Sequence, residues 1–99
     1  MKVTIYCVLI DAENQFALKR EVNLHVLPRI GEQIDGLTID LIRHFSEPAS
    51  TYLFVGGDVG NAKKAKERIL GMKYSECPYD EWFRTRWDRP DPVKKAVEL

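Results

Sequence analysis

The glycine-rich segment 56–64 contains the residue types that bind phosphate groups. A strand-like run, "TYLFV", leads into a glycine cluster that precedes several lysines; the glycines are Gly56, Gly57 and Gly60. Backbone N–H groups of such a loop can surround a phosphate that a lysine also reaches. The spacing fits neither nucleotide-binding pattern, since no Gly-Lys-Ser/Thr follows and the three glycines do not form G-x-G-x-x-G. The segment therefore predicts a strand-to-helix turn without a cofactor, in which Asp58 caps the helix N-terminus.

The histidines and cysteines are the next candidates for chemistry. His25, His44 and Cys77 could ligate a metal, or form an enzyme site with Asp88, if the fold brought them together. None of them lies at ligand spacing from another, and no nucleophile-elbow or zinc-protease motif is present. Cys7 lies among apolar residues and is typical of an inert core thiol. We therefore expect no metal and no catalytic residue, and an enzyme with a scattered site is only the third hypothesis.

The segment "WFRTRW", residues 82–87, is the richest in residues that bind other macromolecules. Tryptophan and arginine are the types most enriched in protein-binding hot spots. Aromatic rings interleaved with arginines also suit single-stranded nucleic acid, because bases stack on the rings. The alternative is structural, with Trp82, Phe83 and Trp87 capping the open end of a small barrel and arginine stems lying over the rings.

A lysine-rich helical segment, "NAKKAKERIL", precedes these aromatic residues in the chain. It could form a patch for an acidic protein or a phosphate backbone, or simply a solvated face that maintains solubility. Together the two segments give the predicted partner-binding residues, which are Trp82, Phe83, Arg84, Arg86, Trp87, Lys63 and Lys66.

Size and charge limit what the chain can be. Ninety-nine residues predict a single domain, and 15 basic and 15 acidic residues cancel, so no global field attracts nucleic acid or an anionic membrane. The charge is divided unevenly, with a net −3 over residues 1–58 and +3 over residues 59–99. Two cysteines without a CxxC motif support neither a disulfide framework nor a zinc ribbon. The apolar run at residues 3–10 is too short for a membrane span, so we expect a cytoplasmic protein.

The elements that must position these residues follow from hydrophobic periodicity. Alternating or β-branched runs predict strands at residues 3–10, 16–27, 37–45 and 51–55. The first strand is apolar on both faces and should be covered on both. A stripe at helical spacing then predicts a helix at about 59–71, and residues 79–86 predict a second one after Pro78; the stripe is Ala62, Ala65, Ile69 and Met72. The fold class is therefore α+β, with a small antiparallel barrel or curled sheet of four to five strands, followed by one or two helices.

One stretch of the β region is familiar. A strand ends in a Leu-Pro-Arg-aliphatic-Gly-Glu turn at residues 27–32, and the next strand reads aliphatic-x-x-aliphatic-x-His; that strand supplies Ile39, Ile42 and His44. This pattern resembles a group of short, mostly uncharacterised bacterial and phage proteins. The resemblance covers residues 1–56 and implies a small β-barrel of the Src-homology-3-like kind, with no catalytic residue carried over. Residues 57–99 form a helical, basic and aromatic-rich extension within the same domain, which the resemblance does not cover.

These observations favour a small, non-enzymatic intracellular protein that binds a protein partner through its C-terminal half. The resemblance suggests bacterial or phage origin and, as one form of this function, an inhibitor of a host system. A homodimer is a further expectation. The alternative is a nucleic-acid-binding module that uses the lysine-rich helix and the "WFRTRW" segment.

Overall fold

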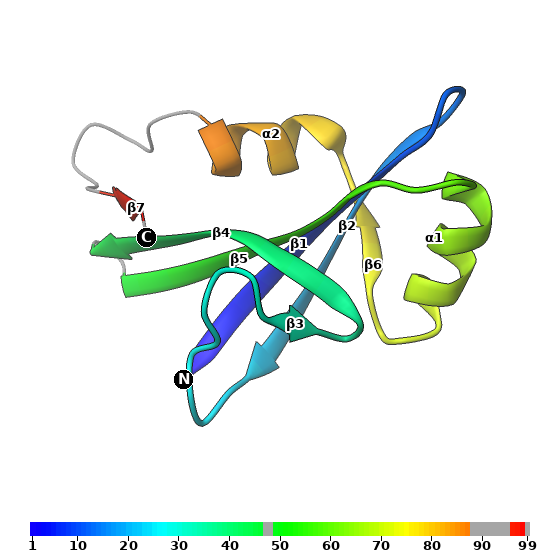
Figure 1. Cartoon of the computed structure of the whole chain (residues 1–99). Coiled ribbons are helices and arrows are strands. Elements are labelled where there is room, and N and C mark those ends of the chain that lie inside the picture. Colours follow the sequence, from blue (N-terminus) through cyan, green and yellow to red (C-terminus); the bar gives the residue numbers. More distant parts are fainter. Residues whose placement is uncertain (47–48, 88–95, 99) are drawn as a thin grey trace.

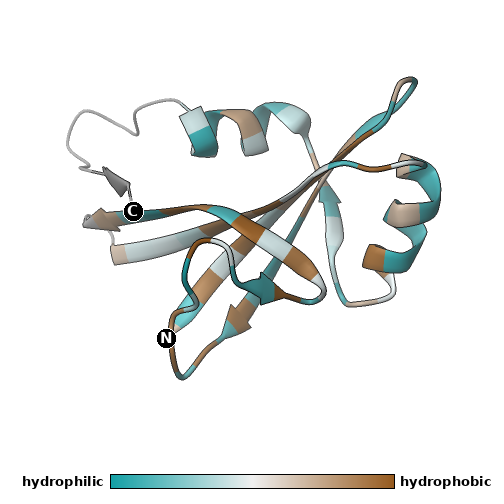
Figure 2. Ribbon diagram, viewed as in Figure 1, coloured by the Kyte–Doolittle hydropathy of each residue, from teal (hydrophilic) through white to brown (hydrophobic). Residues whose placement is uncertain are grey.

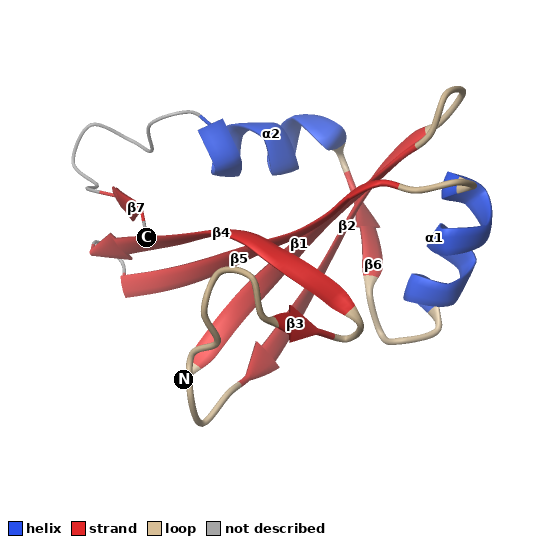
Figure 3. Ribbon diagram, in the orientation of Figure 1, coloured by secondary structure: helices blue, strands red, loops and turns tan. Residues whose placement is uncertain are grey.

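The computed structural model describes residues 1–46, 49–87 and 96–98 (Figure 1). Strands and helices alternate in the second half of the chain only (Figure 3). In chain order the elements are β1 (Lys2–Ile10), β2 (Gln15–Asn23), β3 (Gln33–Ile34), β4 (Leu37–Ser46), β5 (Ala49–Asp58), α1 (Ala62–Leu70), β6 (Ser75–Cys77), α2 (Tyr79–Trp87) and β7 (Ala96–Glu98).

The strands form one curled sheet in the order β3-β4-β5-β1-β2-β6, and β7 adds to β4. The hairpins β1–β2 and β4–β5 are antiparallel, as their short connections predict. The central pair departs from this pattern, because β1 runs parallel to β5. The predicted fold class, an α+β domain with a small curled sheet and C-terminal helices, is confirmed (Figure 1).

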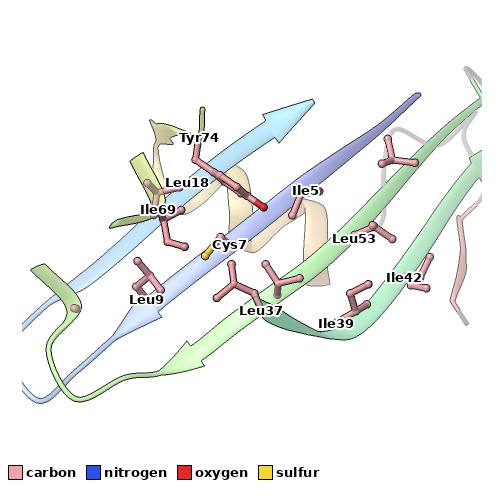
Figure 4. Packing of buried hydrophobic residues seen from close by; sticks show 13 residues of the cluster. Ile5, Cys7, Leu9, Leu18, Leu37, Ile39, Ile42, Leu53, Ile69 and Tyr74 are labelled. Carbon is pink, nitrogen blue, oxygen red and sulfur yellow. The ribbon is translucent and has the colours of Figure 1, made fainter. Parts of the chain in front are cut away.

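Strand β1 separates two apolar clusters, because its side chains alternate between the two faces of the sheet. Ile5, Cys7 and Leu9 lie in the larger cluster, which α1 covers through Ala62 and Ile69 (Figure 4). The opposite face carries a smaller cluster, covered by α2 and composed of Tyr6, Val8, Ala17, Phe54 and Trp82. The expectation that β1 is buried on both faces is thus confirmed, and the two helices lie on opposite sides of the sheet.

The turns explain why glycines occur between β2 and β4. Asp35 and Gly36 have φ angles of 54° and 78°, as a two-residue type I′ hairpin between β3 and β4 requires. In the Leu-Pro-Arg-Ile-Gly-Glu motif, the N–H of Glu32 donates to the carbonyl of Arg29 at 3.0 Å, and Gly31 has a φ of 92°. A positive φ at the third turn position is the signature of a type II turn, which favours glycine there.

Side chains join the two ends of the curled sheet. Asp35, next to β3, accepts hydrogen bonds from Arg20 on β2 at 3.0 Å and from the Tyr74 hydroxyl at 2.9 Å. Tyr74 is buried and lies just before β6, and the Arg20 guanidinium lies over its ring. We call these three residues the seam clasp, because they connect the β3–β4 turn to β2 without a backbone ladder between the strands.

Two predicted strand ends and one predicted helix cap were wrong. Strand β2 ends at Asn23 and not at residue 27, because its partner β1 begins at Lys2, opposite Asn23. Strand β5 continues through the glycines to Asp58, because β1 pairs with it as far as Ile10. Asp58 therefore does not cap α1. Asn61 caps it instead, accepting from the N–H of Lys64 at 3.1 Å.

Candidate functional site

Helix α2 packs on the sheet through one tryptophan. Proline disfavours helical geometry in the residue before it, and α2 begins directly after Pro78, whose carbonyl accepts from the N–H of Glu81. Trp82 is only 6% exposed and lies against the cluster formed with Tyr6 and Phe54. The structural interpretation of "WFRTRW" thus holds for Trp82, which is a core residue.

Two arginines fix the C-terminal half of α2 to β4. Arg86 donates to both carboxylate oxygens of Asp40, each at 3.0 Å, which is the bidentate geometry that arginine favours. Arg43 is buried on β4 and donates to the carbonyl of Thr85 at 2.5 Å, near the helix C-terminus where a cation is favourable. The register of α2 on the sheet is therefore set by directional contacts as well as by apolar packing.

A carboxylate fixes the N-terminal half. Glu81 Oε2 accepts from the Nζ of Lys19 at 2.9 Å and from the Tyr6 hydroxyl at 3.0 Å. The hydrogen bond from Lys19 lowers the pKa of Glu81 below its ordinary value, and the Tyr6 bond acts in the same direction. Burial raises the pKa of Tyr6, so this hydroxyl stays protonated and acts as a donor. The group is an anchor for α2, because Glu81 on the helix is held by Lys19 on β2 and by Tyr6 on β1.

The outer side of α2 carries an aromatic row, which we define as Tyr79, Phe83 and Trp87. Their spacing of four residues places them on one line along the helix, with ring centroids 6.1 Å and 6.5 Å apart. Phe83 is 41% exposed and Trp87 is 58% exposed, while Tyr79 is half-buried against Trp82. The guanidinium of Arg86 lies over the Trp87 ring, 4.9 Å from its centroid. Two members of the aromatic row, Phe83 and Trp87, are thus exposed on a firmly held helix, while Tyr79 also packs against the cluster around Trp82.

Two charged residues lie beside the aromatic row. Asp80 and Arg84 are exposed, one turn apart, and neither forms an ion pair in the described part of the chain. The aromatic row does not stand out in a hydropathy view. Helix α2 is mostly pale and teal in Figure 2, because its Asp, Glu and Arg residues are hydrophilic and the Kyte–Doolittle scale gives Trp and Tyr intermediate values.

The two lysines predicted to join this site lie elsewhere. Lys63 and Lys66 belong to α1, on the opposite face of the sheet from α2. Lys66 also forms an ion pair with Glu76 at 2.7 Å and lies 4.2 Å above the Phe16 ring. The structure therefore groups Phe83, Arg84 and Trp87 on one exposed face and separates the lysines from them.

The scattered candidates for chemistry do not come together. His25 lies beyond β2 and His44 on β4, so that β1 and β5 lie between them, and His44 contacts the Thr51 hydroxyl at 2.9 Å. Cys77 lies on β6, and burial raises its pKa to about 11, which keeps the thiol protonated. Asp88 lies outside the described residues. Within those residues, no three His, Cys, Asp or Glu side chains are arranged to hold a metal.

The residues that anchor the site were not predicted, although some left signals in the sequence. Tyr79 completes the i, i+4, i+8 aromatic row, which spacing alone could have revealed. Asp40 and Arg43 lie in a strand whose pattern shifts at a β-bulge between Ile39 and Leu41, so alternation did not show which face they occupy. Their pairing with α2 spans more than 40 residues of chain and has no local signal.

No protein-family model, curated protein or solved structure matches this chain. Neither helix of the described chain is long and apolar enough to cross a membrane. The function must therefore be argued from the geometry of the α2 face.

Proposed function

We propose that this protein is a non-enzymatic binding module that recognises a protein partner through the outer face of α2. The observation that carries the proposal is the aromatic row, in which Phe83 and Trp87 are about half exposed on a helix that is itself firmly anchored. Large aromatic side chains held in place are the anchors around which binding hot spots form. Preorganisation matters because fewer side chains must be ordered when the partner binds.

The exposed aromatic area limits the affinity that the row alone can supply. A Phe or Trp side chain offers about 150–250 Å², so the exposed parts of Phe83 and Trp87 amount to about 200 Å² together. At about 25 cal/mol per Å², burying this area contributes about 5 kcal/mol. Association costs about 4–15 kcal/mol. The partner must therefore contact more than the row, and Asp80 and Arg84 are exposed charges beside it.

The nucleic-acid alternative has less support from this geometry. It required the lysine-rich helix and the aromatic segment to form one surface, whereas α1 and α2 lie on opposite faces of the sheet. Two of its cations, Lys66 and Arg86, are also engaged by Glu76 and Asp40. Inhibition of a host system by a phage-encoded cytoplasmic protein is one form of the proposed function, and it is suggested only by the resemblance of residues 1–56.

Affinity capture from the native host's lysate tests the proposal. The tagged wild-type chain is compared with a Phe83→Ser/Trp87→Ser variant, and captured proteins are quantified by mass spectrometry. A Lys63→Ala/Lys64→Ala variant on α1 is the matched control, because both lysines are exposed on the other face. Loss of the captured protein in the α2 variant alone supports the proposal; equal capture by all three chains contradicts it.

A further inference from the structure

We propose that two copies of this chain pair through the outer faces of their α2 helices, antiparallel to each other about a two-fold axis. This inference rests on the proposed function, because it uses the same exposed aromatic row. It names one partner for that face, which is a second copy of this chain.

The charges beside the row make the face complementary to itself. Asp80 lies in the first turn of α2 and Arg84 one turn later, and both are exposed without an ion pair among the described residues. A two-fold axis perpendicular to two antiparallel helices sets the N-terminal half of one against the C-terminal half of the other. Such an axis also keeps the sides of the interface: residues to one side of the line along which the two helices touch lie on that same side in both copies. Asp80 of each copy therefore faces the partner's Arg84, and the pair forms twice.

The aromatic row is compatible with the same arrangement. Phe83 lies near the middle of the nine-residue helix, so the two-fold axis sets Phe83 beside the partner's Phe83. Trp87 then extends toward the partner's Tyr79 at the other end of the row. Helix axes that pack at about 8–10 Å bring such rings into contact. A parallel arrangement, whose two-fold axis runs along the helices, would instead place the two copies' charged residues on opposite sides of the contact line, so Asp80 would not meet the partner's Arg84.

The size of the contact predicts a weak, reversible dimer. A nine-residue helix is only about 13.5 Å long, and its outer face is too small for the ~1,200 Å² of buried area that stable interfaces need. We therefore expect a dissociation constant on the order of 100 μM, in the range of transient contacts. Such a dimer would cover Phe83 and Trp87 at high concentration and leave them exposed at low concentration.

Sedimentation equilibrium of the full chain, from about 10 μM to about 1 mM at about 150 mM salt, tests the pairing. The average mass should rise from that of a monomer, 11.5 kDa, toward twice that value. The Phe83→Ser/Trp87→Ser variant should stay monomeric throughout, with an unchanged circular dichroism spectrum as the control for folding. A wild-type chain that remains monomeric at about 1 mM, or a variant that still dimerises, overturns the inference.

Charge reversal provides a sharper test of the antiparallel geometry. Asp80→Arg alone and Arg84→Asp alone should each weaken dimerisation about tenfold, because two attractive contacts per dimer become repulsive. An equimolar mixture of the two variants should recover the wild-type affinity, since every reversed charge then meets its opposite on the other chain. A mixture that associates no better than either variant overturns the geometry.

The outcomes also separate this inference from the proposed function. A monomeric wild-type chain whose capture of another protein depends on Phe83 and Trp87 overturns the pairing and leaves the proposed function standing. A dimer that responds to charge exchange, together with unchanged capture by the α2 variant, overturns the proposed function and leaves the pairing.

Discussion

Replacement of Gly56 by alanine should destabilise the protein more than any other glycine substitution near it. Gly56 has a φ of 96°, and a Cβ at this position would lie 2.1 Å from the carbonyl oxygen of Val8 in the neighbouring β1. A positive φ costs a non-glycine residue about 1–2 kcal/mol. Overpacking against a backbone that cannot turn aside adds about 1–3 kcal/mol. Gly56→Ala should therefore lower the free energy of unfolding by about 2–5 kcal/mol.

Two neighbouring glycines separate the contributions to this loss. Gly57 also has a positive φ, 134°, but a Cβ there meets nothing within 4 Å, so Gly57→Ala should cost only the strain of about 1–2 kcal/mol. Gly60 has neither a positive φ nor a close neighbour, and Gly60→Ala should be neutral or stabilise by about 0.4–1 kcal/mol.

Urea unfolding, followed by far-ultraviolet circular dichroism, measures the free energy of unfolding of all three variants. The values are comparable when the slope of this free energy with urea concentration is the same in each variant. The expected order of stability is Gly60→Ala, then Gly57→Ala, then Gly56→Ala. If Gly56→Ala were no less stable than Gly57→Ala, the close approach of β5 to β1 would be refuted.

Three further predictions concern the contacts that hold α2 on the sheet and the contacts of the seam clasp. Asp40→Asn removes the charge opposite Arg86 and should lower the free energy of unfolding by no more than about 1 kcal/mol, measured in urea, because the carboxylate is half exposed. Glu81 has a lowered pKa in the folded protein, so the stability it contributes is present above its unfolded pKa of about 4.3 and is lost as pH falls through the folded pKa. Glu81→Gln should abolish this part of the acid dependence. An unchanged dependence of the free energy of unfolding on pH would argue against the anchor. Tyr74→Phe removes the hydroxyl that donates to Asp35 and should cost about 0.5–1.5 kcal/mol in thermal or urea unfolding, whereas no change would mean that the seam clasp contributes nothing.

Much of the fold could be predicted from the sequence because its signals are local. The apolar run of β1 and the helical stripe of α1 each depend on neighbours in the chain. The errors arose where a distant partner decides the outcome. Strand β2 stops where β1 runs out, and β5 continues because β1 still pairs with it. The parallel pairing of β1 with β5 is equally non-local, since hairpin-length loops predict only antiparallel neighbours.

The candidate site was predictable in composition but not in arrangement. Enrichment in Trp, Phe and Arg drew attention to residues 82–87, and helical spacing predicted that they share a helix. Which of them would be buried depended on the contact between Trp82 and the sheet face formed by Tyr6 and Phe54. The separation of Lys63 from the aromatic row depended on the sheet lying between the two helices. Neither contact leaves a pattern in a single sequence.

The most direct test of a protein-binding face on α2 is photo-crosslinking in the native host. A photoreactive phenylalanine analogue, p-benzoylphenylalanine, replaces Phe83 in one chain and Lys63 in a second, so that both probes are exposed but on opposite faces of the sheet. After irradiation, the account predicts a discrete crosslinked protein from the Phe83 position and none from the Lys63 position. Crosslinking at Lys63 alone, or equal crosslinking at both positions, would contradict it.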